Sequence, residues 1–206
     1  MSPLPPRPNL TLVLVSGASR GFGKAIVRKI SESHKLFQPR TTDIVVTSTN
    51  AAHLEAEKIW LEKVGFNVVA LSVDYRVVAS MKAHVDEISQ SLTQPLQGYA
   101  SIYVFHNAGS LGTLEPVHSL SPASYIDTIT VNLTSPLILT SLLLNTFNSR
   151  PEILWTFINT SSLAAVQPFE YWAQYCSVKA ARDMFFQCLA KESSIAKSAI
   201  RVLNYA

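Results

Sequence analysis

A glycine-rich loop stands between a predicted strand and a predicted helix near the start of the chain. Leu10–Val15 is an apolar, β-rich run, residues 16–23 read Ser-Gly-Ala-Ser-Arg-Gly-Phe-Gly, and an amphipathic pattern follows over Lys24–Ser33. Three of the chain's seven glycines lie in this loop, and they are Gly17, Gly21 and Gly23. A strand, a glycine loop and a helix in this order are typical of a site that binds a dinucleotide pyrophosphate at the helix N-terminus. The alternative is an ordinary turn between two elements.

The remaining strand and helix patterns alternate along the chain. Apolar runs that predict strands are Ile44–Thr47, Asn67–Val73, Ser101–Phe105, Ile153–Ile158 and Ile200–Ala206. Helical spacing occurs over Ala51–Lys63, Val77–Leu92, Pro122–Phe147 and Trp172–Glu192. This alternation predicts an α/β protein of Rossmann type, a doubly wound parallel sheet with helices on both faces. With 206 residues the chain fits one domain, which we place at residues 10–206 after a loose, proline-rich tail at residues 1–9.

Composition and charge restrict the class of protein and its partners. Hydrophobic residues make up 48% of the chain and charged residues 15%, as in a compact protein. The net charge of +3 comes without a block of Lys or Arg, and no apolar run reaches about 18 residues, so we expect neither nucleic acid nor a membrane as partner. The tail is too rich in proline for a signal peptide. Cys176 and Cys188 fall ~18 Å apart along one predicted helix, too far for a disulfide. We expect a reduced, cytoplasmic protein without a metal site.

The predicted second and third strands end at residues that would face a nucleotide. Folds that prefer NAD place an Asp or Glu after the second strand to bind the ribose 2′-hydroxyl, and here Ser48, Thr49 and Asn50 stand there. Arg20 in the glycine loop is suited instead to a 2′-phosphate, which favours NADPH. Asp74 has two interpretations: it accepts a hydrogen bond from the adenine amino group, or it caps the helix that follows.

The fourth predicted strand is followed by His106-Asn107-Ala108-Gly109. Small residues and an Asn suit a backbone that must pass close to a cofactor. His106 has no evident partner, so we expect a packed residue rather than a catalyst. The expected cofactor contacts are Gly17, Ala18, Ser19, Arg20, Gly21, Phe22, Gly23, Thr49, Asn50, Asp74, Tyr75, Asn107, Ala108 and Gly109, together with Tyr175 and Lys179.

A serine, a tyrosine and a lysine are spaced so that they can meet at the carboxyl edge of the sheet. Ser162 stands just past the strand Ile153–Ile158, and Tyr175 and Lys179 are four residues apart on one face of the next helix. A phenol has an ordinary pKa of about 10, and a neighbouring ammonium would lower that pKa so that the phenol can protonate a carbonyl oxygen. The serine hydroxyl would hold that oxygen. Taken alone, the Tyr-x-x-x-Lys pair has a plainer interpretation, an amphipathic helix whose lysine reaches solvent. The serine and the glycine loop favour catalysis.

Pro136 lies inside the predicted helix Pro122–Phe147. A proline nitrogen cannot donate to the carbonyl four residues back, which is that of Asn132. We expect the freed carbonyl to hold a water that leads towards Lys179 and supplies Tyr175 with protons. The alternative is that the proline simply separates two helices.

The chain resembles the short-chain dehydrogenase/reductase family over nearly its whole length. The motifs that carry the resemblance stand in family order, and they are Gly17-x-x-x-Gly21-x-Gly23, Asn107-Ala-Gly109, Asn132, Ser162 and Tyr175-x-x-x-Lys179. The resemblance implies that Ser162 orients a substrate carbonyl, that Tyr175 protonates it, and that Lys179 lowers the pKa of Tyr175 and holds the nicotinamide ribose. It implies also that Asn132 supports the proton relay. The helices around residues 124–148 and 172–192 would form the four-helix contact of a homodimer.

Within the family, several segments are similar to the branch that reduces pterin side-chain ketones with NADPH in the last step towards tetrahydrobiopterin. They are residues 17–23, 107–112, 166–169, Trp172, residues 175–176 with 179–184, and residues 201–206. The substrate would then lie near Ser161, Ser162, Gln167, Phe169, Trp172 and Tyr175, whose aromatic faces suit a flat pterin. Ordinary packing of the loop on the sheet is the alternative for Ser161, Gln167, Phe169 and Trp172. For the substrate, the alternative is another vicinal dicarbonyl, such as an aromatic diketone.

Two departures from that branch change the expectations. The branch typically has an arginine after the second strand, where this chain has Thr49, so the preference for NADPH would rest on Arg20. The family also continues beyond Ala206 with a Pro-Gly loop, a lid, a seventh strand and an acidic residue that anchors the pterin. We therefore expect a fragment or a natural short form with little or no turnover. A non-catalytic chain that binds nucleotide and dimerises is a further alternative.

Overall fold

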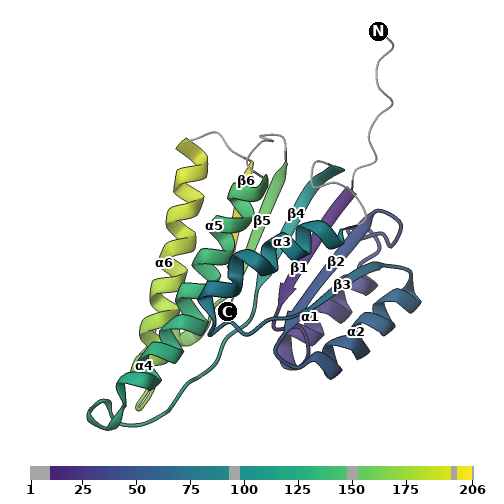
Figure 1. Ribbon diagram of the computed structural model, residues 1–206. Coiled ribbons are helices and arrows are strands. Elements are labelled where there is room, and N and C mark those ends of the chain that lie inside the picture. Colours follow the sequence, from purple (N-terminus) through teal and green to yellow (C-terminus); the bar gives the residue numbers. More distant parts are fainter. Residues whose placement is uncertain (1–9, 93–97, 148–152, 196–198, 206) are drawn as a thin grey trace, which may run out of the picture.

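Six parallel strands form one sheet, and helices pack on both of its faces (Figure 1). The computed structural model describes residues 10–92, 98–147, 153–195 and 199–205, so the tail expected at residues 1–9 and the last residue, Ala206, lie outside the described residues. The strand order is β3-β2-β1-β4-β5-β6, and every neighbouring pair is parallel. This is the Rossmann-type arrangement that the alternation of strands and helices predicts.

The elements follow the predicted ranges closely. The strands are β1 (Leu10–Ser16), β2 (Thr42–Ser48), β3 (Asn67–Ser72), β4 (Tyr99–His106), β5 (Leu154–Thr160) and β6 (Ile200–Tyr205). The helices are α1 (Gly21–Glu32), α2 (Ala51–Val64), α3 (Met81–Ser91), α4 (Pro122–Ile129), α5 (Ser135–Phe147) and α6 (Ala173–Ile195). The helix expected over Val77–Leu92 differs, since it opens with a 3₁₀ turn at Val78–Ser80 before α3 begins.

Two hydrophobic clusters hold the helices to the sheet. On one face, Val27 of α1 and Leu61 of α2 are completely buried with residues of β1 and β2. On the other face, Val85 of α3, Leu143 of α5 and Phe186 of α6 pack against the same strands and against β4 and β5. Full burial of one such side chain stabilises a fold by roughly 1.5–3 kcal/mol relative to leaving it exposed. The sheet is therefore a rigid base for the loops at its edge.

The strand order reverses between β1 and β4, which are direct neighbours with Val15 opposite Phe105. From β1 the chain continues to α1 on one face of the sheet, and from β4 it continues to α4 and α5 on the other. Such a reversal opens a crevice at the carboxyl ends of the two strands. The glycine loop follows β1 and Asn107–Gly109 follows β4, so the fold brings both predicted nucleotide motifs to this crevice.

The helical stretch expected over Pro122–Phe147 consists of α4, a π-helical turn at Thr130–Thr134, and α5. Ser121 caps its start by accepting a hydrogen bond from the backbone N–H of Ser124 at 3.2 Å. In the described part of the chain, Pro122–Thr146 is the one helical stretch long and apolar enough to cross a membrane, judged by length and composition alone. Its Leu139 and Leu143 lie in the hydrophobic core against the sheet, the position of a core helix.

Candidate active site

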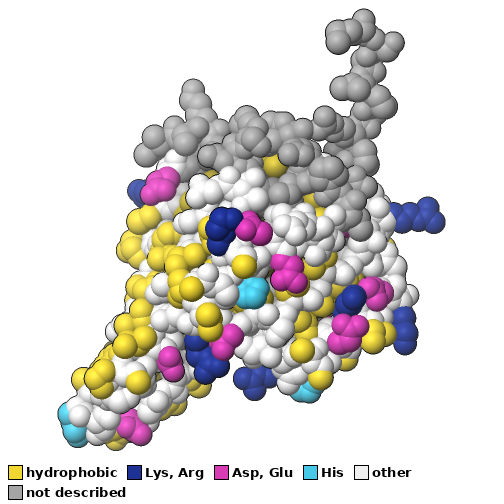
Figure 2. Space-filling view, in the orientation of Figure 1, with side chains coloured by type: hydrophobic (Ala, Val, Ile, Leu, Met, Phe, Trp, Pro, Cys, Tyr) yellow, Lys and Arg dark blue, Asp and Glu magenta, His cyan; other side chains and the backbone are white. Residues whose placement is uncertain are grey.

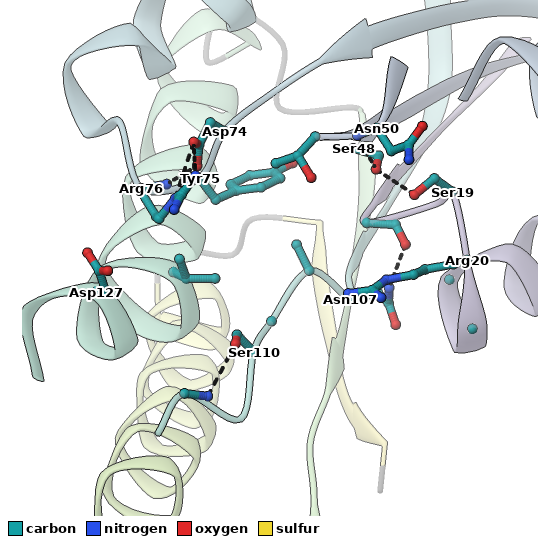
Figure 3. A pocket seen from close by; sticks show the side chains of 18 of the residues that line it. Ser19, Arg20, Ser48, Asn50, Asp74, Tyr75, Arg76, Asn107, Ser110 and Asp127 are labelled. Carbon is teal, nitrogen blue, oxygen red and sulfur yellow. Dashed lines mark hydrogen bonds and ion pairs between the residues drawn. The ribbon is translucent and has the colours of Figure 1, made fainter. Parts of the chain in front are cut away.

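A cavity of about 770 Å³ opens at the carboxyl ends of β1, β2 and β4 (Figure 3). Its walls come from the glycine loop, the end of β2, the segments after β3 and β4, and α4. Predicted cofactor residues in these walls are Gly17, Ser19, Arg20, Gly21, Phe22, Gly23, Thr49, Asn50, Asp74, Tyr75, Asn107, Ala108 and Gly109. The described residues Ser162, Tyr175 and Lys179 do not line this cavity. The nucleotide candidates and the catalytic candidates thus form two adjoining regions.

Gly17 and Gly23 let the glycine loop fold closely onto itself. Gly17 has φ +70°, a left-handed conformation that favours glycine. A Cβ atom on Gly23 would lie 2.1 Å from the carbonyl oxygen of Gly17 and 2.5 Å from Nδ2 of Asn107. The N-cap residue of α1 is Arg20, whose side chain makes no capping hydrogen bond, so the first N–H groups of the helix are left for a ligand. This loop fits an anionic group such as a pyrophosphate.

Ser16 and Asn107 join the ends of β1 and β4 behind the loop. Asn107 donates from Nδ2 to the carbonyl oxygens of Ser16 at 3.0 Å and Gly17 at 3.2 Å. The Oγ atom of Ser16 accepts from the backbone N–H groups of Asn107 and Ala108, both at 3.0 Å. The predicted residues Asn107 and Ala108 therefore lie where they fix the shape of the cavity wall.

Ala18 and Tyr75 both contact Thr47 at the end of β2. Ala18 is completely buried, and its N–H donates to the carbonyl of Thr47 at 2.9 Å, so Ala18 supports the loop from the core and does not line the cavity. The Tyr75 hydroxyl is hydrogen-bonded to Oγ1 of Thr47 at 2.6 Å. Burial raises the pKa of Tyr75 to about 12. Tyr75 forms part of the wall as a neutral phenol.

Asp74 forms an ion pair with Arg76 at one edge of the cavity (Figure 3). Nη2 of Arg76 lies 2.7 Å from Oδ2, and both Nε and the backbone N–H of Arg76 donate to Oδ1 at 3.0 Å. These hydrogen bonds hold the pKa of Asp74 below its usual range. The capping interpretation of Asp74 is wrong, because the carboxylate binds Arg76 and the N-cap position of α3 is Ser80. The adenine contact stays a prediction.

The end of β2 presents hydroxyl and amide groups to the cavity. The Oγ atoms of Ser48 and Ser19 are hydrogen-bonded at 2.6 Å, and Thr49 is exposed. Asn50 also has a structural role, since its Oδ1 accepts from the N–H of His53 at 2.9 Å and caps α2. His53 lines the cavity as well, although sequence reasoning did not single it out. The sequence feature that could have identified His53 is its position three residues after an Asn that caps a helix.

The Ser162 hydroxyl lies beside the phenol of Tyr175, and Lys179 follows Tyr175 by one turn of α6. Ser162 comes two residues after β5, and its Oγ accepts from the N–H of Ala164 at 3.1 Å, which caps a short 3₁₀ turn. Nζ of Lys179 lies 5.5 Å from the centroid of the Tyr175 ring and donates to the carbonyl of Thr160 at 2.6 Å. The structure thus brings the three residues together as the sequence predicts.

Burial shifts both titratable groups of this set towards their neutral forms. It raises the pKa of Tyr175, while the polar Ser162 side chain beside the phenol and the charge of Arg182 act in the opposite direction. It lowers the pKa of Lys179 to about 7, and the charge of Arg182 adds to that effect. The expectation that Lys179 holds the pKa of Tyr175 down is therefore not met. A lysine with this pKa carries only part of a positive charge near neutrality, and the cation that acts on the phenol is Arg182.

Asn132 is completely buried in the π-turn and ties that turn to the segment after β4. Its Nδ2 donates to the carbonyls of Ser110 at 2.8 Å and Thr128 at 2.9 Å, and its Oδ1 accepts from the N–H of Ser110 at 3.0 Å. The backbone carbonyl of Asn132 accepts from Nη1 of Arg182 at 3.3 Å. The structure therefore gives this carbonyl a buried arginine as its partner, where the sequence hypothesis placed a water.

Phe169, Trp172 and Tyr175 form a run of aromatic rings beside Ser162. The ring centroids of Phe169 and Trp172 are 5.3 Å apart, and those of Trp172 and Tyr175 are 5.8 Å apart in an edge-to-face arrangement. Gln167 and Phe169 are exposed, and Trp172 is half-buried. Rings that are open to solvent on one side can bind a flat substrate, so this geometry is compatible with the substrate contacts predicted for these residues.

Ser161 belongs instead to a hydrogen-bond network around Asp183 of α6. Its Oγ donates to Oδ2 of Asp183 at 2.5 Å, and Nδ2 of Asn159 donates to Oδ1 at 2.8 Å. Asn204 of β6 donates from its Nδ2 to the backbone carbonyl of Asp183 at 3.2 Å. The Ser161 hydroxyl is committed to this carboxylate, so the geometry supports a role in fixing α6 to β5 rather than the predicted substrate contact.

Sequence reasoning missed Arg182, which lies seven residues, or two helical turns, after Tyr175 on the same face of α6. The sequence feature that could have identified Arg182 is a charged residue at a position that helical spacing places in the core. His106 is the packed residue that we expected: it is buried, and its Nε2 is hydrogen-bonded to Oγ1 of Thr140 at 2.9 Å. Burial holds the pKa of His106 well below its ordinary value.

Comparison with known proteins gives one family. The family model described as short chain dehydrogenase matches residues 11–206. Sepiapterin reductase of Xenopus tropicalis is 36% identical over 202 residues, which cover 95% of this chain and 72% of that protein. Sepiapterin reductase of Bos taurus is 33% identical over 198 residues, covering 95% of this chain and 71% of that protein.

More distant relatives share the same span. Benzil reductase ((S)-benzoin forming) of Bacillus cereus is 26% identical over 194 residues, covering 94% of this chain and 73% of that protein. Among solved structures, a metagenomic short-chain oxidoreductase in complex with NADP superposes with a TM-score of 0.78 at 24% identity. The superposition covers 93% of this chain and 79% of that one, and at this identity it shows a common fold.

Proposed function

The chain belongs to the short-chain dehydrogenase family, and on that premise we propose that it is an NADPH-dependent carbonyl reductase of the sepiapterin reductase kind. The observation that carries the proposal is the placement of Ser162, just beyond the end of β5, beside Tyr175 and Lys179 of α6. The same helix reaches the nucleotide cavity through Arg182, which donates to the carbonyl of the wall residue Ala108 at 3.2 Å. A proton donor and a dinucleotide cavity in one site are what carbonyl reduction requires.

The glycine loop and the end of β2 would hold the cofactor. The close approach at Gly17 and Gly23 and the free N–H groups at the start of α1 fit a pyrophosphate. Arg20 and Thr49 are exposed on the cavity wall, and an arginine with no neighbouring carboxylate after β2 favours the 2′-phosphate of NADPH. When bound, the nicotinamide supplies a hydride.

The chain's own residues would supply the proton. Burial raises the pKa of Tyr175, so its O–H is intact near neutrality and available to a carbonyl oxygen held by the Ser162 hydroxyl. When the O–H bond breaks, the proton passes to that oxygen and a phenolate remains, which nearby positive charge stabilises. Lys179, with its pKa of about 7, both binds and releases protons near neutrality, which suits it to return a proton to Tyr175.

A pterin side-chain ketone is the substrate that we propose, as part of tetrahydrobiopterin synthesis. The support is the identity of 31–36% to sepiapterin reductases over about 95% of the chain. The rings of Phe169 and Trp172 supply aromatic surface beside Tyr175 for a flat bicyclic group. The similarity to benzil reductase of Bacillus cereus supports a second candidate, an aromatic vicinal diketone.

The experiment is a steady-state assay of NADPH oxidation with sepiapterin and with benzil. We expect slow turnover of sepiapterin, at the low level that the sequence predicts, and a loss of roughly 100-fold or more in the Tyr175→Phe variant. The matched control is Tyr103→Phe, which keeps the ring that packs edge-on against Phe37 and should retain the parent rate. A much higher rate on benzil would reject the pterin and favour the diketone. Nucleotide binding without turnover of either substrate would reject the reductase and leave the non-catalytic alternative.

We also propose that the protein is a homodimer through α4, α5 and α6. Figure 2 shows hydrophobic side chains gathered along the side of the molecule that these helices form. In these helices, Ile126 and Ile129 of α4 are 65% and 42% exposed, and Met184 of α6 is 58% exposed. Large apolar residues exposed together mark an interaction surface. Sedimentation should give a dimer that Ile126→Asp converts to monomers, and a monomeric parent at micromolar concentration would contradict the proposal.

A further inference from the structure

Arg182 is a fully buried cation behind the Tyr175–Lys179 pair. Its side chain has no exposed surface, and it lies on the face of α6 that carries both catalytic candidates. Burial of an arginine is expensive unless its donors are satisfied, and its charge is strongly felt where water is excluded. A helix that only had to pack on this sheet would carry an apolar residue here, as it does at Phe186 one turn later.

The guanidinium binds three backbone carbonyls. Nη2 donates to the carbonyl of His106, and Nη1 donates to those of Ala108 at 3.2 Å and Asn132 at 3.3 Å. Two of these carbonyls belong to the segment at the end of β4, where Ala108 lines the cavity, and the third belongs to the π-turn. Arg182 therefore holds together three parts of the site: the cavity wall, the turn with Asn132, and the helix with Tyr175.

In the part of the chain that the structure describes, no carboxylate forms an ion pair with this arginine. The nearest acidic partner is Asp183, whose two carboxylate oxygens accept from Ser161 and Asn159. Nε of Arg182 finds no hydrogen-bond partner within the described residues. Burial lowers the pKa of Arg182 to about 10, which still leaves it charged at neutral pH. The site therefore contains a fixed positive charge that is balanced by carbonyl dipoles.

The charge of Arg182 acts on both Tyr175 and Lys179. Arg182 lowers the pKa of Lys179 by repulsion, and it lowers the pKa of Tyr175 by stabilising the phenolate. Apart from those two residues, the titratable groups that feel this cation are Asp183 on α6, His106 at the end of β4, and Tyr75 after β3. His106 is held neutral by burial, and Tyr75 is neutral as well. Among the described residues, the carboxylate that acts on this cation is that of Asp183.

We propose that Arg182 is a positioning residue of the reductase, which holds the His106–Ala108 segment and the π-turn in place and supplies the fixed positive charge behind Tyr175 and Lys179. The proposal rests on the carbonyl reductase function proposed above. It divides a task that the resemblance gives to Lys179 alone: Arg182 favours the phenolate electrostatically, while Lys179, near neutrality, is free to move protons.

The test compares Arg182→Met, Arg182→Gln and Arg182→Lys with the parent. Met removes the charge and the donors, Gln keeps an amide donor without charge, and Lys keeps the charge but loses the planar fork. Arg40→Met is the matched control, because Arg40 is exposed before β2 at the far end of the sheet. One readout is kcat and KM as a function of pH. The other does not depend on turnover: lysine labelled with ¹³C at Cε is titrated by NMR, with the Lys179 signal assigned from its absence in Lys179→Arg.

We expect the Met and Gln variants to lose ~10- to ~100-fold in kcat with little change in KM, because the loss is one of alignment rather than of substrate binding. In both, Lys179 should titrate above its parent value of about 7, since a repelling cation has gone. The pH profile of kcat should shift upwards with it. The Lys variant should lose rate while Lys179 titrates as in the parent, and the Arg40 control should match the parent in every readout.

The proposal is overturned if the folded Met or Gln variant keeps the parent titration of Lys179 and the parent pH profile, since Arg182 would then be structural only. If neither neutral variant folds, Arg182→Lys decides: an unchanged kcat would reject the positioning role, and a reduced kcat with an unmoved titration would support it. Failure of the reductase function itself is seen separately. In that case the parent would turn over neither sepiapterin nor benzil, whereas the NMR titration of Lys179 would still report the charge of Arg182.

Discussion

The ammonium nitrogen of Lys179 lies 5.5 Å from the centroid of the Tyr175 ring, yet its hydrogen bond goes to the carbonyl of Thr160 at 2.6 Å. The two side chains share one face of α6, where Lys179 is buried and Tyr175 is half-buried. Burial disfavours the charged form of each, so the pair prefers a neutral phenol beside a lysine that is easily deprotonated. This preference has a measurable consequence for stability.

Replacing Lys179 by Met should change how stability depends on pH. The pKa of Lys179 is about 7 in the folded protein against an ordinary value of 10.5, so between these values the unfolded chain binds more protons than the folded one. The free energy of unfolding of the parent therefore rises with pH across this window, and that of Lys179→Met lacks this contribution. Relative to the parent, the variant should be most stable near pH 7 and lose on the order of 1 kcal/mol or more by about pH 10. Urea midpoints at the two pH values measure this, and parallel pH dependence would contradict the assigned burial of a titrating lysine.

Replacing Gly23 by Ala should break the glycine loop. The added Cβ would lie 2.1 Å from the Gly17 carbonyl oxygen and 2.5 Å from Asn107 Nδ2, so the loop must move away from the end of β4. We expect a loss of roughly 2 kcal/mol in stability and at least ~10-fold in NADPH affinity, as for overpacking at a rigid contact. Gly21→Ala is the matched control: its φ of +53° costs about 1 kcal/mol, but a Cβ there has open space. Calorimetric titration with NADPH distinguishes Gly23→Ala from Gly21→Ala. Equal NADPH affinities for the two variants would rule out the proposed pyrophosphate site.

Exchanging the residues beside the ribose should change the choice of nucleotide. Arg20→Gln removes a cation from the cavity wall, and Thr49→Asp places a carboxylate where folds that prefer NAD carry one. Each change should weaken binding of 2′,5′-ADP by ~10-fold or more and leave 5′-AMP within about twofold, because only the 2′-phosphate is affected. Thr49→Arg should act in the opposite direction. Calorimetric Kd values for the two adenosine phosphates measure this, and equal losses for both would show that these residues do not read the 2′ position.

Much of the fold could be predicted because its signals are local. The apolar run Leu10–Val15, the glycines that follow it and the helical spacing after them each lie within one window of the chain, and the six predicted strands all form. The Tyr175–Lys179 pair could be predicted for the same reason, since one helical turn fixes its geometry. The position of Ser162 beside this pair could be predicted because Ser162 follows the end of β5, at the edge of the sheet where α6 begins.

What sequence reasoning missed depends on contacts between distant segments. Arg182 meets Ala108, which is 74 residues away, and Asn132, which is 50 residues away. Arg182, and not a water, is the partner of the Asn132 carbonyl that Pro136 leaves free. The charge of Arg182, in place of that of Lys179, acts to lower the pKa of Tyr175. Asp74 forms an ion pair with Arg76 instead of capping a helix, and the Ser161 hydroxyl donates to Asp183 instead of facing a substrate. Residue types and spacing do not state which of several polar partners a side chain takes.

Tyr171 holds a backbone conformation that its residue type disfavours, and relieving it should stabilise the protein. Its φ is +66°, the left-handed region that costs an L-residue with a Cβ roughly 1–2 kcal/mol, while its exposed ring makes little packing contribution to offset that cost. Asn tolerates this conformation, so Tyr171→Asn should raise the free energy of unfolding by about 0.5–1 kcal/mol, whereas Tyr171→Val should lower it because a β-branched residue is strained further. Tyr171→Phe is the control, with the same backbone preference and an unchanged stability. Tyr171 immediately precedes Trp172, whose ring lies 5.8 Å from that of Tyr175, so the Asn variant should also keep the parent rate. Urea midpoints rank the variants, and an Asn variant less stable than the Phe control would mean that the ring of Tyr171, rather than its backbone, determines stability at this position.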